Sequence, residues 1–123
     1  MLYSDELKMI DLLITFRDDI IEIQEERNAK LIKPANVQLQ AIYKLHVSAK
    51  SSFVKIEHYL KSLYTSFNFA AVIVSDLLKK KSLDSRTLER LDECFEVMIK
   101  CCTVMIEKLK NPSAPTATKK NKK

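Results

Sequence analysis

Apolar residues recur along most of the chain at intervals of three and four, which is the spacing of one face of an α-helix. In the first segment, which Ser4 or Asp5 can cap and which runs to about Asn28, the recurring positions are Met9, Leu13, Phe16, Ile20 and Ile23. Further apolar residues make this stripe wider than a two-helix seam; they are Ile10, Leu12, Ile14 and Ile21. We therefore expect a first helix that contacts more than one neighbour.

A second apolar register begins after Pro34, a residue suited to the first position of a helix, and continues for 43 residues without a shift. Its positions are Ala35, Leu39, Ile42, His46, Ala49, Phe53, Ile56, Leu60, Leu63, Phe67, Ala70, Val74 and Leu77. One helix through all of them would be about 65 Å long. Two stretches rich in serine, threonine or asparagine, residues 48–52 and 65–69, are candidate breaks because these side chains compete for backbone hydrogen bonds.

The last segment has the most regular pattern. Ser82, Asp84 or Ser85 can cap its start, and Pro112 follows its end. Its apolar positions keep one register throughout: Leu88, Leu91, Phe95, Met98, Cys102, Met105 and Leu109. Residues 111–123 contain prolines and lysines but no apolar periodicity, so we predict a disordered basic tail there.

These segments predict an all-α protein. Our first expectation is a four-helix up-and-down bundle over residues 1–110. The segment after Asn68 should be its central member, covered on most sides, because apolar residues there also lie outside the main register; they are Phe69, Ala71, Val72 and Ile73. The alternative is a long central helix over residues 35–81 flanked by two antiparallel helices. Two helices would cover that stripe poorly, so we expect this form to dimerise.

Glycine is absent from the 123 residues. Because glycine is the usual residue where the backbone needs positive φ or approaches a phosphate closely, the sequence excludes a P-loop, a GxGxxG loop and a GxSxG nucleophile elbow. Tight hairpins are disfavoured for the same reason. Four asparagines could still take left-handed backbone positions: Asn28, Asn36, Asn68 and Asn111.

The N-terminal ten residues lack the basic and apolar regions of a secretory signal. The longest nearly apolar run has 12 residues and contains Asp76, so we expect no membrane span. Three cysteines, an odd number without a signal sequence, fit a reducing compartment. The expected location is the cytoplasm or the nucleus.

Charge is distributed unevenly along the chain. Residues 1–29 hold eight acids and three bases, whereas residues 30–67 hold six bases and one acid. The simplest interpretation is that the first two helices lie side by side with complementary polar edges. The lysines, with Tyr43, Tyr59 and Tyr64 between them, are also a candidate nucleic-acid surface. The lysines of this candidate surface are Lys44, Lys50, Lys55, Lys61, Lys79, Lys80 and Lys81.

Three cysteines lie on the last predicted helix. Cys101 and Cys102 cannot form a disulfide without distorting that helix, and Cys94 is about 10 Å from Cys101 along its axis. Their spacing does not match a zinc site, and two histidines elsewhere add no recognised ligand pattern. We expect Cys102 to pack in the core, and Cys94 and Cys101, at its edge, to be the candidate reactive thiols.

His46 occupies a position of the apolar register. A buried histidine usually finds one hydrogen-bond partner, and this is our expectation for it. Two alternatives are a polar residue that sets the register and a residue near the end of a cavity. No HExxH or Glu-x-x-His pattern makes it part of a metal site.

The sequence contains no recognisable catalytic set. Its adjacent acids, Asp18 with Asp19 and Glu25 with Glu26, fall on one polar helix side. We expect no enzyme activity, cofactor, metal or small-molecule substrate. The predicted function is that of a helical adaptor or small subunit of a multiprotein complex, which acts through a protein partner or self-association. The alternative is a nucleic-acid-associated helical protein that uses the basic second helix and the tail.

Overall fold

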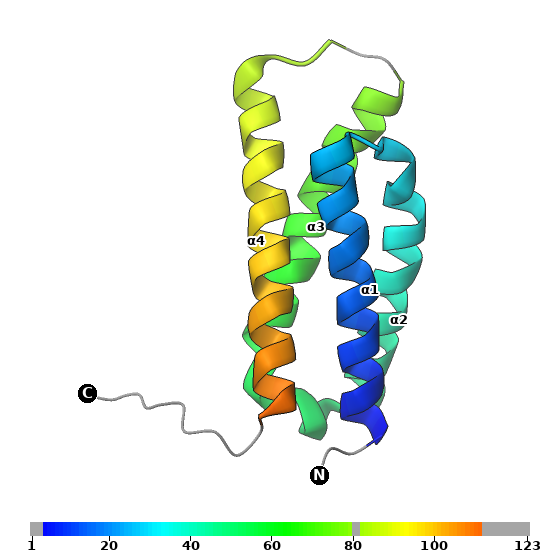
Figure 1. The fold of residues 1–123 in the computed structure, drawn as a ribbon, viewed down its shortest axis with the longest axis vertical. Helices are drawn as coiled ribbons and strands as arrows, with labels where there is room; N and C mark the ends of the chain where they lie inside the picture. The colour runs from blue at the N-terminus through cyan, green and yellow to red at the C-terminus, as the bar shows by residue number, and fades with distance from the viewer. Residues whose placement is uncertain (1–3, 80–81, 112–123) are drawn as a thin grey trace, which may run out of the picture.

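Four α-helices alternate in direction along the part of the chain that the computed structural model describes, residues 4–79 and 82–111 (Figure 1). They are α1 (Ser4–Glu26), α2 (Ile32–Ser48), α3 (Glu57–Leu78) and α4 (Ser85–Lys110). Two 3-10 segments, η1 (Ala29–Leu31) and η2 (Lys50–Ile56), join α1 to α2 and α2 to α3. The predicted all-α, up-and-down bundle is confirmed, while the predicted tail beyond Asn111 lies outside the described residues.

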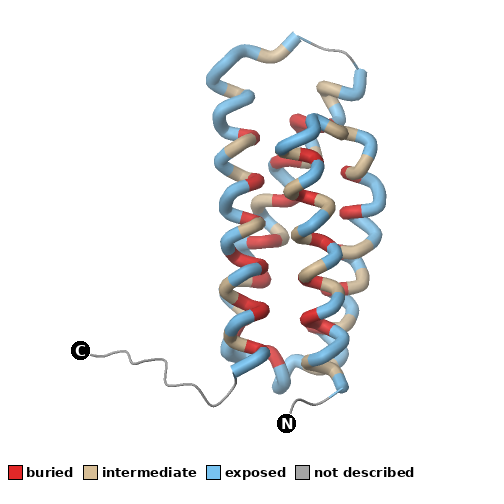
Figure 2. Tube along the Cα trace, viewed as in Figure 1, coloured by how far each residue is buried: buried red, intermediate tan, exposed pale blue. Residues whose placement is uncertain are grey.

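The helices do not contact one another equally. Helix α1 packs along both α2 and α4, and α3 packs along α4, whereas α2 and α3 approach each other over a much shorter length. Buried residues of the helices face a common interior (Figure 2). Across this core, the ring centroids of Phe16 on α1 and Phe67 on α3 are 5.7 Å apart. The first helix therefore has more than one neighbour, as its wide stripe predicts.

The long apolar register is interrupted at the first of its two candidate breaks. The backbone leaves helical geometry at Ala49 (φ −136°, ψ 48°) and again at Phe53 (φ −121°, ψ 18°), and α3 starts at Glu57. Phe53 and Ile56 are both 1% exposed, so the register remains buried through the turn and closes this end of the core. The long central helix is therefore wrong, and with it the argument that such a helix would dimerise.

The second candidate break, residues 65–69, is wrong because α3 continues through it to Leu78. Phe67 is buried in the core, while Thr65 and Asn68 lie on the exposed side of the helix. Such residues are tolerated within a helix when their side chains face solvent. The burial of Phe67 thus outweighs the weak helix preference of its neighbours.

The turn after α1 places the one positive φ among the described residues at Arg27 (φ 54°). None of the four candidate asparagines takes such a position: Asn28 and Asn111 have negative φ, and Asn36 and Asn68 lie inside helices. A left-handed residue after a helix is usually glycine, which this chain lacks. Arg27 takes the position at a steric cost and gains an ion pair with Asp92 at 3.2 Å.

Helix α2 starts slightly earlier than expected, whereas α4 starts after one of its three candidate N-caps. Helix α2 begins at Ile32, two residues before Pro34, which lies in the first turn where its missing N–H needs no partner. Asp84 is the N-cap of α4, since its side chain accepts a hydrogen bond from Thr87 N at 2.8 Å. This bond holds the pKa of Asp84 below its ordinary value.

Two expectations about coverage are also wrong. Phe69 is 40% and Val72 66% exposed, so α3 is not covered on most sides. The reason is that α3 packs closely along α4 but not along α2. Leu88, placed in the core register of the last helix, is 37% exposed because it lies near the end of α4 that extends past α1 (Figure 1).

We expect Phe67→Ala to lower the free energy of unfolding by about 3–5 kcal/mol, because it removes a ring that is 2% exposed and leaves a cavity. Phe69→Ala is the matched control, two residues away on the same helix but on its exposed side. Its expected cost is about 1 kcal/mol or less. Urea denaturation of the two variants checks this, and equal losses would contradict the orientation of α3.

Candidate interaction surface

The side of the bundle between α2 and α3 is incompletely closed. We call it the α2–α3 edge and define it by side chains that recur at helical spacing on the facing sides of the two helices. Its residues are Asn36, Gln40, Tyr43 and Val47 on α2, and Tyr64, Asn68, Ala71, Val72 and Ser75 on α3. All of them are exposed except Tyr64 and Ala71, which are half-buried. Two helices packed in close contact would bury these positions.

Aromatic side chains hold the edge together at the level where α2 and α3 do meet. The rings of Tyr43 and Tyr64 are 5.6 Å apart and nearly perpendicular, with an interplanar angle of 73°, which is a favourable edge-to-face geometry. The Tyr64 hydroxyl lies 3.1 Å from Nδ1 of His46. Burial raises the pKa of Tyr64 well above its ordinary value, so the hydroxyl remains protonated at neutral pH.

His46 is 7% exposed and is the buried polar residue of the described core. Tyr64 is its hydrogen-bond partner, which agrees with the expectation of a single partner. When the hydroxyl donates to Nδ1, the ring proton lies on Nε2, which has no hydrogen-bond partner. The carboxylate of Glu57 is the nearby acid, with Oε2 at 3.7 Å from Nε2. His46 thus links the end of α2 to the start of α3 across the turn.

The predicted basic surface is divided by the fold. Lys44 is near the end of α2, Lys50 and Lys55 lie in η2, and Lys61 follows the start of α3, so these four exposed lysines gather around the turn. Lys79 lies at the other end of α3, and Lys80 and Lys81 lie outside the described residues. The lysines therefore do not form one continuous helix face, which was an assumption of the nucleic-acid hypothesis. Lys55 also lines a hollow together with Glu6 and Lys108.

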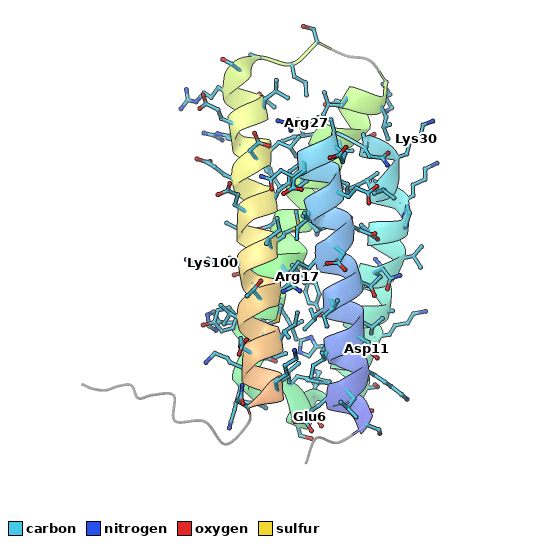
Figure 3. The ribbon with its side chains drawn as sticks, viewed as in Figure 1. Glu6, Asp11, Arg17, Arg27, Lys30 and Lys100 are labelled. Carbon is cyan, nitrogen blue, oxygen red and sulfur yellow. The ribbon has the colours of Figure 1, made fainter. Side chains whose placement is uncertain are left out.

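The acidic first helix is tied to α4 by polar contacts. Arg27 pairs with Asp92, and Nη1 of Arg17 donates to Oγ1 of Thr103 at 3.2 Å (Figure 3). Helix α1 also packs along α2 as predicted, but within the described residues neither Lys44 nor Lys61 forms an ion pair with α1. Burial, and then the charges of neighbouring acids, raise the pKa of Asp19 on the acidic side. The unpaired lysines remain accessible to another molecule.

The cysteines occupy different environments along α4. Cys102 is 0% and Cys101 9% exposed, Cys94 is half-buried, and all three are free thiols. Burial raises the pKa of each thiol, and it raises that of Cys102 to about 12. Within the described residues, no three histidine, cysteine or acidic side chains are grouped to hold a metal ion.

Sequence reasoning identified the core but not the α2–α3 edge. Tyr43 and Tyr64 appeared only as aromatic residues between lysines, and Val72 was expected to be covered. The sequence did contain a sign of this edge. Apolar residues lie outside the main register in both halves of residues 35–77, among them Tyr43, Val47 and Val72. Periodicity shows that such positions are apolar, but only the arrangement of the helices shows that no neighbour covers them.

We expect Tyr64→Phe to lower the free energy of unfolding by about 1–2 kcal/mol, because it leaves Nδ1 of the buried His46 without its partner. Tyr43→Phe, which keeps the ring contact and removes an exposed hydroxyl, is the matched control and should change stability by about 0.5 kcal/mol or less. Chemical denaturation of both variants checks the difference. An unchanged stability of Tyr64→Phe would show that this hydrogen bond does not contribute.

We expect iodoacetamide to alkylate Cys94 first, Cys101 next and Cys102 last in the folded protein. The reactive form is the thiolate, and both burial and the raised pKa lower its accessible amount at Cys102. Raising the pH should speed the reaction, because it increases the thiolate fraction of each cysteine. Peptide mapping by mass spectrometry over time gives the order, and earlier alkylation of Cys102 would contradict the register of α4.

Each helix in the described part of the chain is too short or too polar to cross a membrane. Comparison with family models, with curated proteins and with solved structures finds no match to the chain. The arrangement of its own residues is therefore the basis for a functional proposal.

Proposed function

We propose that the protein is a non-enzymatic helical adaptor, or a small subunit of a multiprotein complex, that acts through protein–protein interaction in the cytoplasm or nucleus. The observation that supports this proposal is the row of uncovered apolar side chains along α2 and α3. Tyr43 and Val47 on α2 are 51% and 46% exposed, and Val72 on α3 is 66% exposed.

Single exposed apolar residues are common on soluble proteins, so their exposure alone does not indicate a binding surface. Their arrangement on the two helices is the evidence for one. Tyr43 and Val47 lie on the same side of α2, one helical turn apart, and Val72 is an exposed valine of α3, about two turns after Tyr64. An apolar row rimmed by polar residues is typical of a surface that another protein covers. A bundle edge with two antiparallel helices is also a common way to present a groove to a partner helix.

The second candidate is association with nucleic acid, which the four lysines around the turn favour. Lys44, Lys50, Lys55 and Lys61 are exposed at one end of the bundle. Binding of an oligonucleotide that weakens steeply with salt, and is lost on reversal of these four charges, would favour this candidate over the first. No arginine accompanies these lysines between residues 30 and 67, which makes bidentate phosphate contacts there unavailable.

We expect the purified protein to form a stable oligomer or to retain a defined protein partner from cells. Where a partner is retained, we expect the double variant Val47→Ser, Val72→Ser to lose it. The control is Val97→Ser on α4, a valine 43% exposed, which should retain it. Light scattering gives the mass, and quantitative capture gives the partner. A monomer without a partner, or equal loss in the control, would contradict the proposal; circular dichroism checks that each variant is folded.

A further inference from the structure

We propose that the α2–α3 edge binds an acidic amphipathic helix of a partner protein, laid lengthwise between α2 and α3. The inference rests on the proposed function, which it makes specific by naming the surface and the chemistry of the partner.

The edge offers the groups that a partner helix needs. Tyr43 and Val47 on α2, with Ala71 and Val72 on α3, provide apolar contacts from both sides. Asn36, Gln40 and Asn68 alternate with them as exposed amide groups that can donate and accept hydrogen bonds. A helix laid in this position presents apolar residues at intervals of three and four, which match the rows on α2 and α3.

Lysines border the edge on both helices. Lys33 and Lys44 lie one helical turn from the edge residues Asn36 and Val47. On α3, Lys61 lies one helical turn from Tyr64, and Lys79 lies one turn from Ser75. All four lysines are exposed. A helix with apolar residues at its centre and acids on both flanks would therefore find complementary charge along each side.

The acids of α2 and α3 are fewer than the lysines that border the edge. Glu57 lies beside the buried His46, 3.7 Å from its Nε2, at the end of the edge. Asp76 already takes part in an interaction within the protein. The four bordering lysines thus outnumber the two acids of α2 and α3. The resulting net positive charge lies where the flanks of a bound helix would be.

The same charges disfavour a second copy of this chain as the occupant. A two-fold symmetric contact through the edge would place its lysines opposite one another, which is destabilising. Residues 112–123 of the same chain are also a poor occupant, because they contain four lysines and no large apolar residue. An acidic helix from another protein fits both the apolar centre and the basic borders.

Nucleic acid is the other anionic class that the lysines could attract. The edge between the lysines is, however, largely aliphatic and amide in character, and Tyr43 already contacts Tyr64 edge to face. Base stacking needs an accessible aromatic face, and phosphate contacts need a continuous row of cations. The apolar row favours the helix, and an oligonucleotide serves as a competitor in the test.

The test is an affinity selection from a displayed library of 20-residue helical peptides that have fixed leucines at helical spacing and flanks randomised among Glu, Lys and Gln. The full chain is the bait. We expect peptides with glutamate on both flanks to be enriched and to protect the backbone amides of α2 and α3 at the edge from hydrogen exchange. Enrichment of basic or neutral flanks, protection elsewhere, or no enrichment would overturn the inference.

The charge contribution is measured with the variant Lys44→Glu, Lys61→Glu, which should weaken binding of the selected peptide about tenfold, and less at high salt. The matched control is Lys8→Glu, Lys100→Glu, which changes net charge equally at exposed lysines of α1 and α4 and should change affinity less than about twofold. In Figure 3, Lys100 lies on the outer side of α4. Equal effects of the two variants would overturn the inference.

A 20-base-pair DNA duplex is added as competitor. Tighter binding of the duplex than of the peptide at the edge would overturn the inference in favour of nucleic acid. The proposed function has a separate outcome: a cellular partner that is retained, but cross-links to a face other than α2 and α3, would leave that function standing while the inference about this edge fails.

Discussion

The turn between α2 and α3 is the constraint on which the rest of the bundle depends. A single apolar register extends from Ala35 to Val74, and its two halves can face the same interior only when the chain reverses between them. The non-helical backbone at Ala49 and Phe53 provides that reversal without a glycine. Because Phe53 and Ile56 stay in register through the turn, the reversal also closes one end of the core, and α1 and α4 can then cover the two halves of the stripe.

The same turn explains why one side of the bundle is less complete than the others. α2 and α3 are adjacent in sequence, yet each packs mainly on a different helix, α2 on α1 and α3 on α4. What joins α2 to α3 directly is local: the ring contact of Tyr43 with Tyr64 and the hydrogen bond of Tyr64 with His46. Beyond this level the edge side chains are small, amide or aliphatic, and most of them are exposed. The stability of the core and the accessibility of the edge are thus two results of one packing pattern.

Much of this fold follows from the sequence because helix periodicity reports which side chains share a face. That is why the core of α1 and six of the eight buried residues of α4 were predicted, with Cys102 inside; Cys101, expected at the edge, and Ile106 are buried as well. Periodicity does not report whether another helix covers a given apolar face, so Phe69 and Val72 were placed wrongly. Nor does it decide between two polar stretches as the site of a break, because that depends on tertiary packing at Phe67. The pairing of His46 with Tyr64 exists only once the chain has reversed, and no local pattern indicates it.

The bundle can also be described as two helical hairpins, α1 with α2 and α3 with α4, which η2 connects and which the contact of α1 with α4 holds together. The two hairpins therefore contact each other mainly through α1 and α4, whereas the covalent connection between them, η2, joins α2 to α3. This makes η2 a natural split point: a chain divided between Ser48 and Glu57 would retain complementary surfaces on both pieces, including the ion pair of Arg27 with Asp92. The architecture is suited to reassembly from two separately produced halves, in which the peptide link contributes proximity and the α1–α4 contact contributes recognition.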